Sequence, residues 1–327
     1  MALLEKKIIE IICFIVAQFY LGKAELKDLL VLKYPTLGAV KNAVLNELYY
    51  SFRTKKGYRL TSVNLEVTNH CNLNCSMCPV KSEMRRDKGY MRFDLFKKVI
   101  DENPQLEFVL PFQWGEPLLH PEIFDMIQYA TDKGIRSMMT TNGVLLDDEK
   151  TDKLLHCGLT RLTFSLDGTA EVYEKVRKVP YQDIKKKILN FISERDKQKS
   201  SLKVDLNMVV FGETENVVRD YKKEWKGIAD RIQIIPRLEQ KGRNRIYPCR
   251  ELWRGSLVVL WDGRVVPCCA DYDAKQVVGD VNKETLVNIW QGEKMQRLRR
   301  LHRKKIFSDY CRYCDEYETS LVNPRFR

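Results

Sequence analysis

The sequence predicts an α/β protein whose central part is a partial (β/α)6 barrel, with a helical N-terminal extension and a small C-terminal hairpin-plus-helix domain. Short runs rich in β-branched residues alternate with helical stretches from residue 63 to about residue 236. This alternation is typical of a parallel sheet covered by helices. Beyond residue 240 it stops, so we divide the chain into an extension at 1–60, a barrel at 61–240 and a C-terminal domain at 241–327.

Six strands are predicted in the barrel, with helices between them, at residues 63–68, 106–112, 135–141, 161–167, 203–211 and 231–236. The carboxyl ends of parallel strands meet at one edge of such a sheet, where ligands bind. In the C-terminal domain, residues 256–269 form two β-rich runs joined by Asp262-Gly263, which predicts a hairpin. One helix is expected around residues 283–301.

The extension contains the most apolar part of the chain, residues 8–21. This segment is interrupted by Glu10 and Gln18 and is too short to span a bilayer. No small-residue cleavage site follows it, so a signal peptide is not expected. Two interpretations stay open: a helical cap packed on the barrel, or a helix lying on a membrane surface, which the amphipathic segment 39–52 favours.

Composition limits the class of protein and its partners. The chain has 327 residues, of which 44% are apolar, enough for a large core without disulfides. Most of its ten cysteines are clustered, which indicates that they bind a metal or cluster and that the protein works in a reducing compartment. We expect a cytoplasmic protein, with attachment to the inner face of the membrane as the open alternative. The net charge of +12 favours anionic partners or is a solvated basic surface, and without a nucleic-acid-binding signature we expect no nucleic acid partner.

A first thiol set, Cys71, Cys75 and Cys78, follows the first predicted strand in the spacing C-x3-C-x2-C. Three thiolates on a short loop can hold an iron-sulfur cluster and leave one iron open. A zinc site would need a fourth ligand, and His70 is badly placed because it is adjacent to Cys71.

A second thiol set lies in the C-terminal domain and consists of Cys249, Cys268, Cys311 and Cys314. Four thiolates are enough for a complete cluster with no open iron. A structural zinc ion is the alternative, although only one C-x2-C knuckle is present. Cys13 and Cys157 are expected to be buried apolar residues, and His120 and His156 to be structural.

The order of these motifs along the predicted strands resembles the radical S-adenosylmethionine (radical SAM) superfamily. The resemblance implies that Cys71, Cys75 and Cys78 bind a 4Fe-4S cluster whose open iron chelates S-adenosylmethionine, with Met77 at a position that is often aromatic. Reductive cleavage would give a 5′-deoxyadenosyl radical that abstracts a substrate hydrogen.

The same resemblance implies contacts to S-adenosylmethionine. Trp114-Gly115-Glu116 matches the family's Gly-Gly-Glu motif, with Trp114 in place of the first glycine. The other implied contacts are Asn142 in "TNG", Ser165 and Asp167 in the ribose-binding "S-x-D", and Arg177 and Asn207 by position.

The C-terminal domain resembles SPASM/twitch extensions, in particular the single-cluster twitch form. This implies one auxiliary 4Fe-4S cluster bound by Cys249, Cys268, Cys311 and Cys314, with Cys269 as a spare that could exchange with Cys268. A fully ligated cluster would act as an electron acceptor, which suggests oxidation. Asp271 is a candidate proton acceptor, or alternatively a turn aspartate.

The expected partners are a small-molecule or lipid substrate and an electron donor such as flavodoxin or ferredoxin. Basic residues near the barrel mouth are candidates for binding a phosphate or nucleotide sugar: Arg85, Arg86, Arg237, Lys241, Arg243 and Arg245. The favoured interpretation is a radical enzyme acting on a sugar, cyclitol or lipid. Peptide modification, cofactor maturation and a noncatalytic iron-sulfur scaffold are the alternatives.

Overall fold

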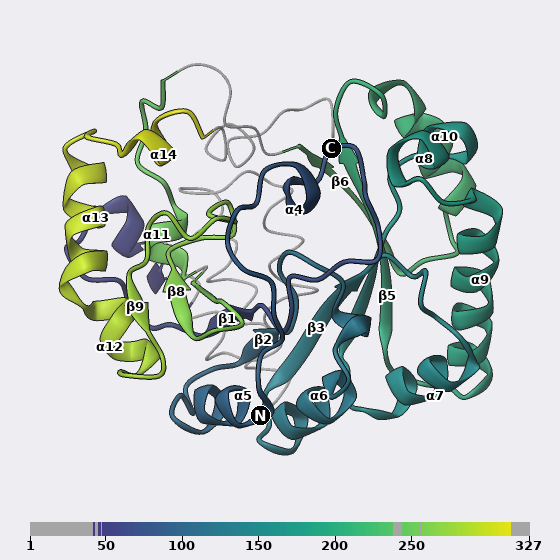
Figure 1. Cartoon of the computed structure of the whole chain (residues 1–327), viewed down its shortest axis with the longest axis horizontal. Helices are drawn as coiled ribbons and strands as arrows, with labels where there is room; N and C mark the ends of the chain where they lie inside the picture. The colour runs from purple at the N-terminus through teal and green to yellow at the C-terminus, as the bar shows by residue number, and fades with distance from the viewer. Residues whose placement is uncertain (1–41, 43–44, 47, 238–243, 256, 315–327) are drawn as a thin grey trace, which may run out of the picture.

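The computed structural model describes residues 42, 45–46, 48–237, 244–255 and 257–314 (Figure 1). The predicted apolar segment 8–21 and Cys13 lie outside these residues, as do Lys241 and Arg243. Of the amphipathic segment predicted at 39–52, residues 42, 45–46 and 48–51 are helical. Within the described residues, no helix combines the length and the apolar character needed to cross a bilayer.

A single sheet of nine strands runs through the described molecule in the order β6-β5-β4-β3-β2-β1-β7-β8-β9. The six predicted barrel strands are all present, and each pairs in parallel with its neighbour. They are β1 (Ser62–Leu65), β2 (Phe108–Leu110), β3 (Arg136–Thr141), β4 (Arg161–Ser165), β5 (Lys203–Val210) and β6 (Arg231–Pro236).

Helices follow the barrel strands, and the larger ones bury one apolar face. In α5 (Phe93–Asp101) the buried residues include Leu95, Phe96 and Val99, the spacing of one helix face. The others in the barrel are α4 (Pro79–Ser82), α6 (Ile123–Asp132), α7 (Asp148–His156), α8 (Ala170–Arg177), α9 (Tyr181–Lys197) and α10 (Val218–Trp225), with 3-10 turns η2 (Pro117–Leu119) and η3 (Glu215–Val217). Figure 1 shows α7 to α10 on the side of the sheet away from the C-terminal helices.

The predicted hairpin is confirmed as β7 (Val258–Val259) and β8 (Arg264–Val266), which pair antiparallel. Gly263 in the turn has φ +95°, a conformation that glycine adopts without strain. β9 (Gly279–Asp280) pairs with β8, and β7 pairs in parallel with β1. The C-terminal segment therefore extends the barrel sheet on its β1 edge.

The single helix expected around residues 283–301 is wrong, because the structure has two helices there. α12 (Leu286–Gln291) ends and α13 (Glu293–Arg303) begins at Gly292, whose backbone is extended. A Cβ at this position would lie 2.8 Å from the carbonyl oxygen of Asn288. Two short helices, α11 (Glu251–Arg254) and α14 (Asp309–Arg312), complete this part of the chain.

Candidate functional site

The residues that follow β1, β2 and β3 are in direct contact, as their position at one edge of the sheet predicts. The Glu116 carboxylate accepts hydrogen bonds from the Thr141 hydroxyl at 2.7 Å and the Asn142 backbone N–H at 2.8 Å. The Asn142 side-chain amide in turn donates to Asn72 in the cysteine loop at 2.9 Å. Burial raises the pKa of Glu116, and these donors oppose that shift.

Gly115 brings Glu116 against the cysteine loop. Its φ is +120°, and an added Cβ would lie 2.5 Å from the Thr68 carbonyl oxygen and 2.8 Å from that of His70. The Glu116 N–H also donates to the His70 carbonyl at 2.8 Å. Only glycine fits this close approach, which places the Glu116 backbone against His70, the residue that precedes Cys71 in the sequence.

The ends of β4 and β5 join the same site through Asp167 and Arg177. The Asp167 carboxylate accepts from the Val209 N–H at 2.6 Å and from the Arg177 Nε at 2.8 Å. Another nitrogen of the Arg177 guanidinium, Nη1, lies 3.7 Å from the Cys75 sulfur. The pKa of Arg177 is raised by the neighbouring negative charges, chiefly that of Asp167, even though burial opposes the shift. Arg177 therefore remains charged and links the carboxylate of β4 to the cysteine loop.

Ser165 and Asn207 stand opposite each other in the register of β4 and β5. The buried Asn207 side-chain oxygen has no hydrogen-bond partner among the described residues. An unsatisfied buried acceptor is costly, and a ligand with a donor group would satisfy it. Asn207 thus suits the expected contact to S-adenosylmethionine.

The three thiols of the first set lie on one loop held to the barrel by backbone hydrogen bonds. The Ser76 N–H donates to the Val176 carbonyl at 3.0 Å, and the Leu73 N–H points to the Cys71 sulfur at 3.5 Å. Burial raises the pKa of Cys71 and raises that of Cys78 to about 11. Because burial disfavours the thiolate form, these cysteines would ionise only with a cation bound to them. They therefore fit a loop that binds iron.

The second thiol set converges although its members are far apart in sequence. The Cys268 thiol interacts electrostatically with Cys249 and Cys311, and Cys249 with Cys314. Burial raises the pKa of Cys249 and Cys268. Cys269 is exposed, which supports Cys268 as the ligand of the two. Within the described residues neither thiol set closes around a single metal ion.

Trp114, which the sequence presents only as a bulky replacement for glycine, connects the two sites. Its indole N–H donates to the Cys269 carbonyl oxygen at 2.9 Å, and the Gln113 amide donates to the same oxygen at 3.1 Å. The Trp114 ring also meets Tyr272 edge-on, with centroids 5.9 Å apart. The motif that carries Glu116 is therefore bonded to the loop that carries Cys268.

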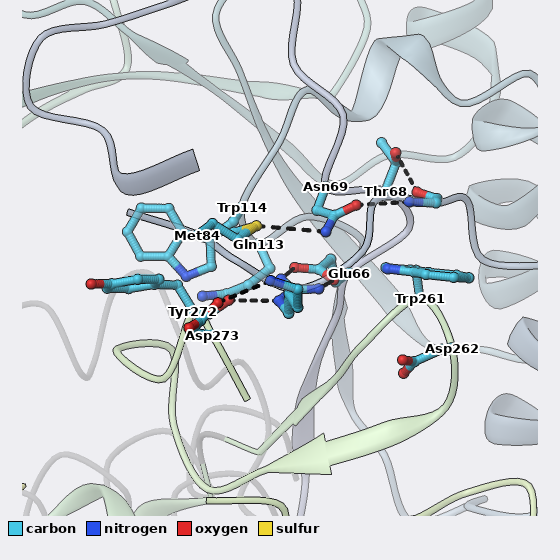
Figure 2. Close-up of polar contacts among 12 residues, drawn as sticks. Glu66, Thr68, Asn69, Met84, Gln113, Trp114, Trp261, Asp262, Tyr272 and Asp273 are labelled. Atoms are coloured by element: carbon cyan, nitrogen blue, oxygen red, sulfur yellow. Dashed lines mark hydrogen bonds and ion pairs between the residues drawn. The ribbon is translucent and has the colours of Figure 1, made fainter. Parts of the chain in front are cut away.

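A buried ion pair reinforces this connection (Figure 2). The guanidinium of Arg86 forms a bidentate pair with Glu66, at the end of β1, and Arg86 Nε donates to the Tyr272 carbonyl at 2.6 Å. The Arg85 N–H, at 2.6 Å, and the Arg86 N–H, at 3.1 Å, both donate to the Asp273 carboxylate. We call Glu66, Arg86 and Asp273 the brace.

Two of the basic residues expected to bind a phosphate are buried and bind groups of the protein instead, so that interpretation is wrong for them. The Arg86 side chain is 4% exposed and paired with Glu66. Arg245 is buried, and its guanidinium donates to the carbonyls of Cys311 and Cys314. The partners of Arg86 and Arg245 lie far from them in the sequence, so the pattern of charges alone does not predict these contacts.

Asp271 lies beside the second thiol set, with both carboxylate oxygens occupied. They accept from the backbone N–H groups of Lys275 and Gln276, each at 2.8 Å. The residue is almost fully buried, and burial raises its pKa. These contacts favour the interpretation as a turn aspartate, while its role as a proton acceptor stays a prediction.

His120 is structural, as its contacts show. Its Nε2 lies 2.8 Å from the Met91 carbonyl and so carries the proton, while Nδ1 accepts the Glu122 N–H at 3.1 Å. Burial lowers the pKa of His120 from 6.5. A protonated Nδ1 could not accept that hydrogen bond.

We expect the free energy of unfolding to fall as pH drops below about 6.5, because the unfolded chain then binds protons that folded His120 and buried His302 do not. Replacing His120 with leucine should cost about 1–3 kcal/mol at pH 7 and make this pH dependence less steep, with the part due to His302 remaining. Urea unfolding of the apo protein at pH 5.5 to 7.5 measures both. His156→Gln, at a side chain 65% exposed, is the control. An unchanged slope in His120→Leu would contradict the assignment.

Comparison with known families agrees with this arrangement. A sequence model of the radical SAM superfamily matches residues 65–223, and one of the SPASM iron-sulfur cluster-binding domain matches residues 249–315. The chain belongs to the radical SAM superfamily. It is a radical SAM enzyme with a C-terminal SPASM domain, whose matched range begins at Cys249. The cofactors of these domains are a 4Fe-4S cluster, S-adenosylmethionine and auxiliary iron-sulfur clusters.

Several curated proteins are similar to this chain in sequence. A tungsten-containing aldehyde ferredoxin oxidoreductase cofactor-modifying protein from Pyrococcus furiosus is 28% identical over 289 residues, 70% of this chain and 80% of that protein. An S-adenosyl-L-methionine-dependent 2-deoxy-scyllo-inosamine dehydrogenase from Niallia circulans is 26% identical over 262 residues, 77% and 92% of the two chains. An AdoMet-dependent heme synthase from Methanosarcina barkeri is 38% identical, over about a third of each chain.

Solved structures share the fold of this radical SAM enzyme. BtrN in complex with AdoMet and 2-DOIA has a TM-score of 0.55 at 20% identity, covering 79% of this chain and 94% of BtrN. Streptococcus suis SuiB bound to S-adenosylmethionine has a TM-score of 0.62 at 13% identity, covering 86% and 78%.

Proposed function

We propose that this radical SAM enzyme oxidises a small, non-peptide substrate at a carbon that bears a hydroxyl group, with a cyclitol or sugar as the favoured class. When bound, the cluster and S-adenosylmethionine supply the radical that removes one hydrogen atom from that carbon. The substrate then loses one proton and one electron, so that the alcohol becomes a carbonyl. The auxiliary cluster is the proposed acceptor of the electron.

The observation that carries this proposal is the bond between Trp114 and the Cys269 carbonyl. It fixes the loop of the second thiol set against the Gly115-Glu116 motif of the S-adenosylmethionine site. Four thiols in that second set leave no iron open for substrate. An electron acceptor that lies beside the radical site and has no iron open to substrate is suited to oxidation.

The similarity to the Niallia circulans dehydrogenase supports the same chemistry, because it extends over 92% of that protein. We also propose that the expected contacts Gly115, Glu116, Asn142, Ser165, Asp167, Arg177 and Asn207 hold S-adenosylmethionine. An external one-electron donor such as flavodoxin or ferredoxin would start the reaction.

A second candidate is the modification of a cofactor, favoured by the similarity to the Pyrococcus furiosus cofactor-modifying protein over 70% of this chain. A metal-cofactor precursor would then replace the cyclitol as substrate. The two candidates share the radical step and differ in the molecule that loses hydrogen.

The test is anaerobic reconstitution followed by incubation with S-adenosylmethionine and deuterium-labelled substrate pools. Deuterium from a polyol or amino-cyclitol pool should enter 5′-deoxyadenosine, with one carbonyl product formed for each labelled molecule. Transfer only from a lipid pool would remove the sugar interpretation. Transfer only from a cofactor precursor or a peptide would favour the second candidate or the peptide alternative. Clusters that form without any cleavage of S-adenosylmethionine would indicate a scaffold and overturn the proposal.

A further inference from the structure

We propose that Arg245 raises the reduction potential of the auxiliary cluster by holding a positive charge among its thiolate ligands. The inference rests on the proposed function only where it treats that cluster as an electron acceptor. It concerns a residue that the sequence places at the substrate rim and that the structure places in the SPASM domain.

Arg245 binds the loop that carries two of the four ligands. Its backbone N–H donates to the Arg312 carbonyl at 2.7 Å, and its Nε donates to the Cys311 carbonyl at 3.1 Å. Its Nη2 donates to the Cys314 carbonyl, also at 3.1 Å. Three donors from one residue thus hold the Cys311–Cys314 turn in place.

The Arg245 guanidinium is also a positive charge close to the thiols, where the Glu251 carboxylate acts on Cys249 with the opposite sign. Arg245 is 3% exposed, and it interacts electrostatically with Cys249, Cys311 and Cys314. An arginine stays charged at any pH at which the protein is folded. Solvent screens a buried charge poorly, so its effect on a neighbouring group is larger than that of a surface charge.

Reduction adds one negative charge to a cluster that is already negative because of its thiolates. A nearby fixed positive charge stabilises the reduced state more than the oxidised state, and net charge and solvent exposure are known determinants of cluster potential. Arg245 is therefore placed to make the cluster a better electron acceptor. It acts as a positioning and tuning residue, since its donors reach backbone carbonyls of the ligand loop.

The test uses full-length protein in which Cys71, Cys75 and Cys78 are replaced by alanine, so that only the auxiliary cluster is loaded. The midpoint potential is measured by an EPR-monitored redox titration without substrate or S-adenosylmethionine. In this background Arg245→Gln removes the charge but keeps an amide donor, and Arg245→Lys keeps the charge. Arg312→Gln is the matched control, because Arg312 is on the same turn with a side chain 47% exposed.

We expect Arg245→Gln to make reduction at least tenfold less favourable, about 59 mV for one electron. Arg245→Lys should stay close to the parent, and Arg312→Gln should shift less than Arg245→Gln. An unchanged potential in an iron-replete Arg245→Gln protein would overturn the proposal. Loss of iron from both Arg245 variants would do so too, because it would leave Arg245 a purely structural role.

The protein that lacks Cys71, Cys75 and Cys78 allows this proposal and the proposed function to be tested separately. If it takes up no cluster, the ligand assignment fails and this inference fails with it. If it shows the expected shift but the complete enzyme oxidises no polyol, the inference stands and the proposed substrate class falls.

Discussion

Replacing Cys75 with alanine is expected to abolish 5′-deoxyadenosine formation while leaving the auxiliary cluster in place. Cys75 is buried, its sulfur lies 3.7 Å from Arg177 Nη1, and its removal leaves the first thiol set with two of its three ligands. Iron content should fall by about four atoms per chain from the roughly eight that two 4Fe-4S clusters require. Iron analysis and chromatography of the reaction mixture measure the two effects together.

Cys157→Ala is the matched control for this experiment. Cys157 is also a buried cysteine, but it follows α7, and its thiol donates to the Leu154 carbonyl at 3.6 Å. We expect unchanged iron content and activity, with a small loss of stability from the removed sulfur. Retention of 5′-deoxyadenosine formation by Cys75→Ala would contradict the assignment of the first thiol set.

Arg86→Met is expected to lower the free energy of unfolding by about 3–5 kcal/mol, because it leaves the Glu66 carboxylate buried without its counter-ion. Glu66 is fully buried, and the Arg86 side chain is nearly so. The same change removes the bond to the Tyr272 carbonyl and so releases the loop of the second thiol set. Urea unfolding of the apo protein measures the stability, and hydrogen exchange of residues 268–276 measures the release.

The surface ion pair of Arg92 and Asp94 provides the control, since its side chains are 76% and 68% exposed. Arg92→Met should cost less than about 1 kcal/mol and leave exchange at residues 268–276 unchanged. The double variant Arg86→Met, Glu66→Gln should recover part of the lost stability, because no buried charge then remains unpaired. If Arg86→Met behaves like Arg92→Met, the brace has no structural role.

The barrel could be predicted from sequence because its signals are local. Each strand is a short β-branched run, and each set of site residues follows one of these runs within a few positions. The order of strands then brings Glu116 and Asn142 together without any knowledge of packing. The two thiol sets were visible for the same reason, because cysteines stand out by type and spacing.

The contacts that join the two sites were not predictable in this way. Arg86 pairs with a residue 20 positions earlier, and Trp114 donates to a carbonyl 155 positions later. A single sequence contains no signal for such pairs, so the sequence predicts substrate binding for Arg86 and not an ion pair. Gly292 is different, because a glycine inside a predicted helix is a visible warning of a break.

The pairing of β1 with β7 has a consequence for how this chain is made. The strand that leads into the first cysteine loop obtains its second neighbour only from residues 258–259. On the ribosome, β1 can therefore pair with β2 long before β7 is synthesised, and one of its edges stays open during that interval. An unpaired strand edge can pair with another chain, and β7 removes this opportunity once the SPASM domain folds.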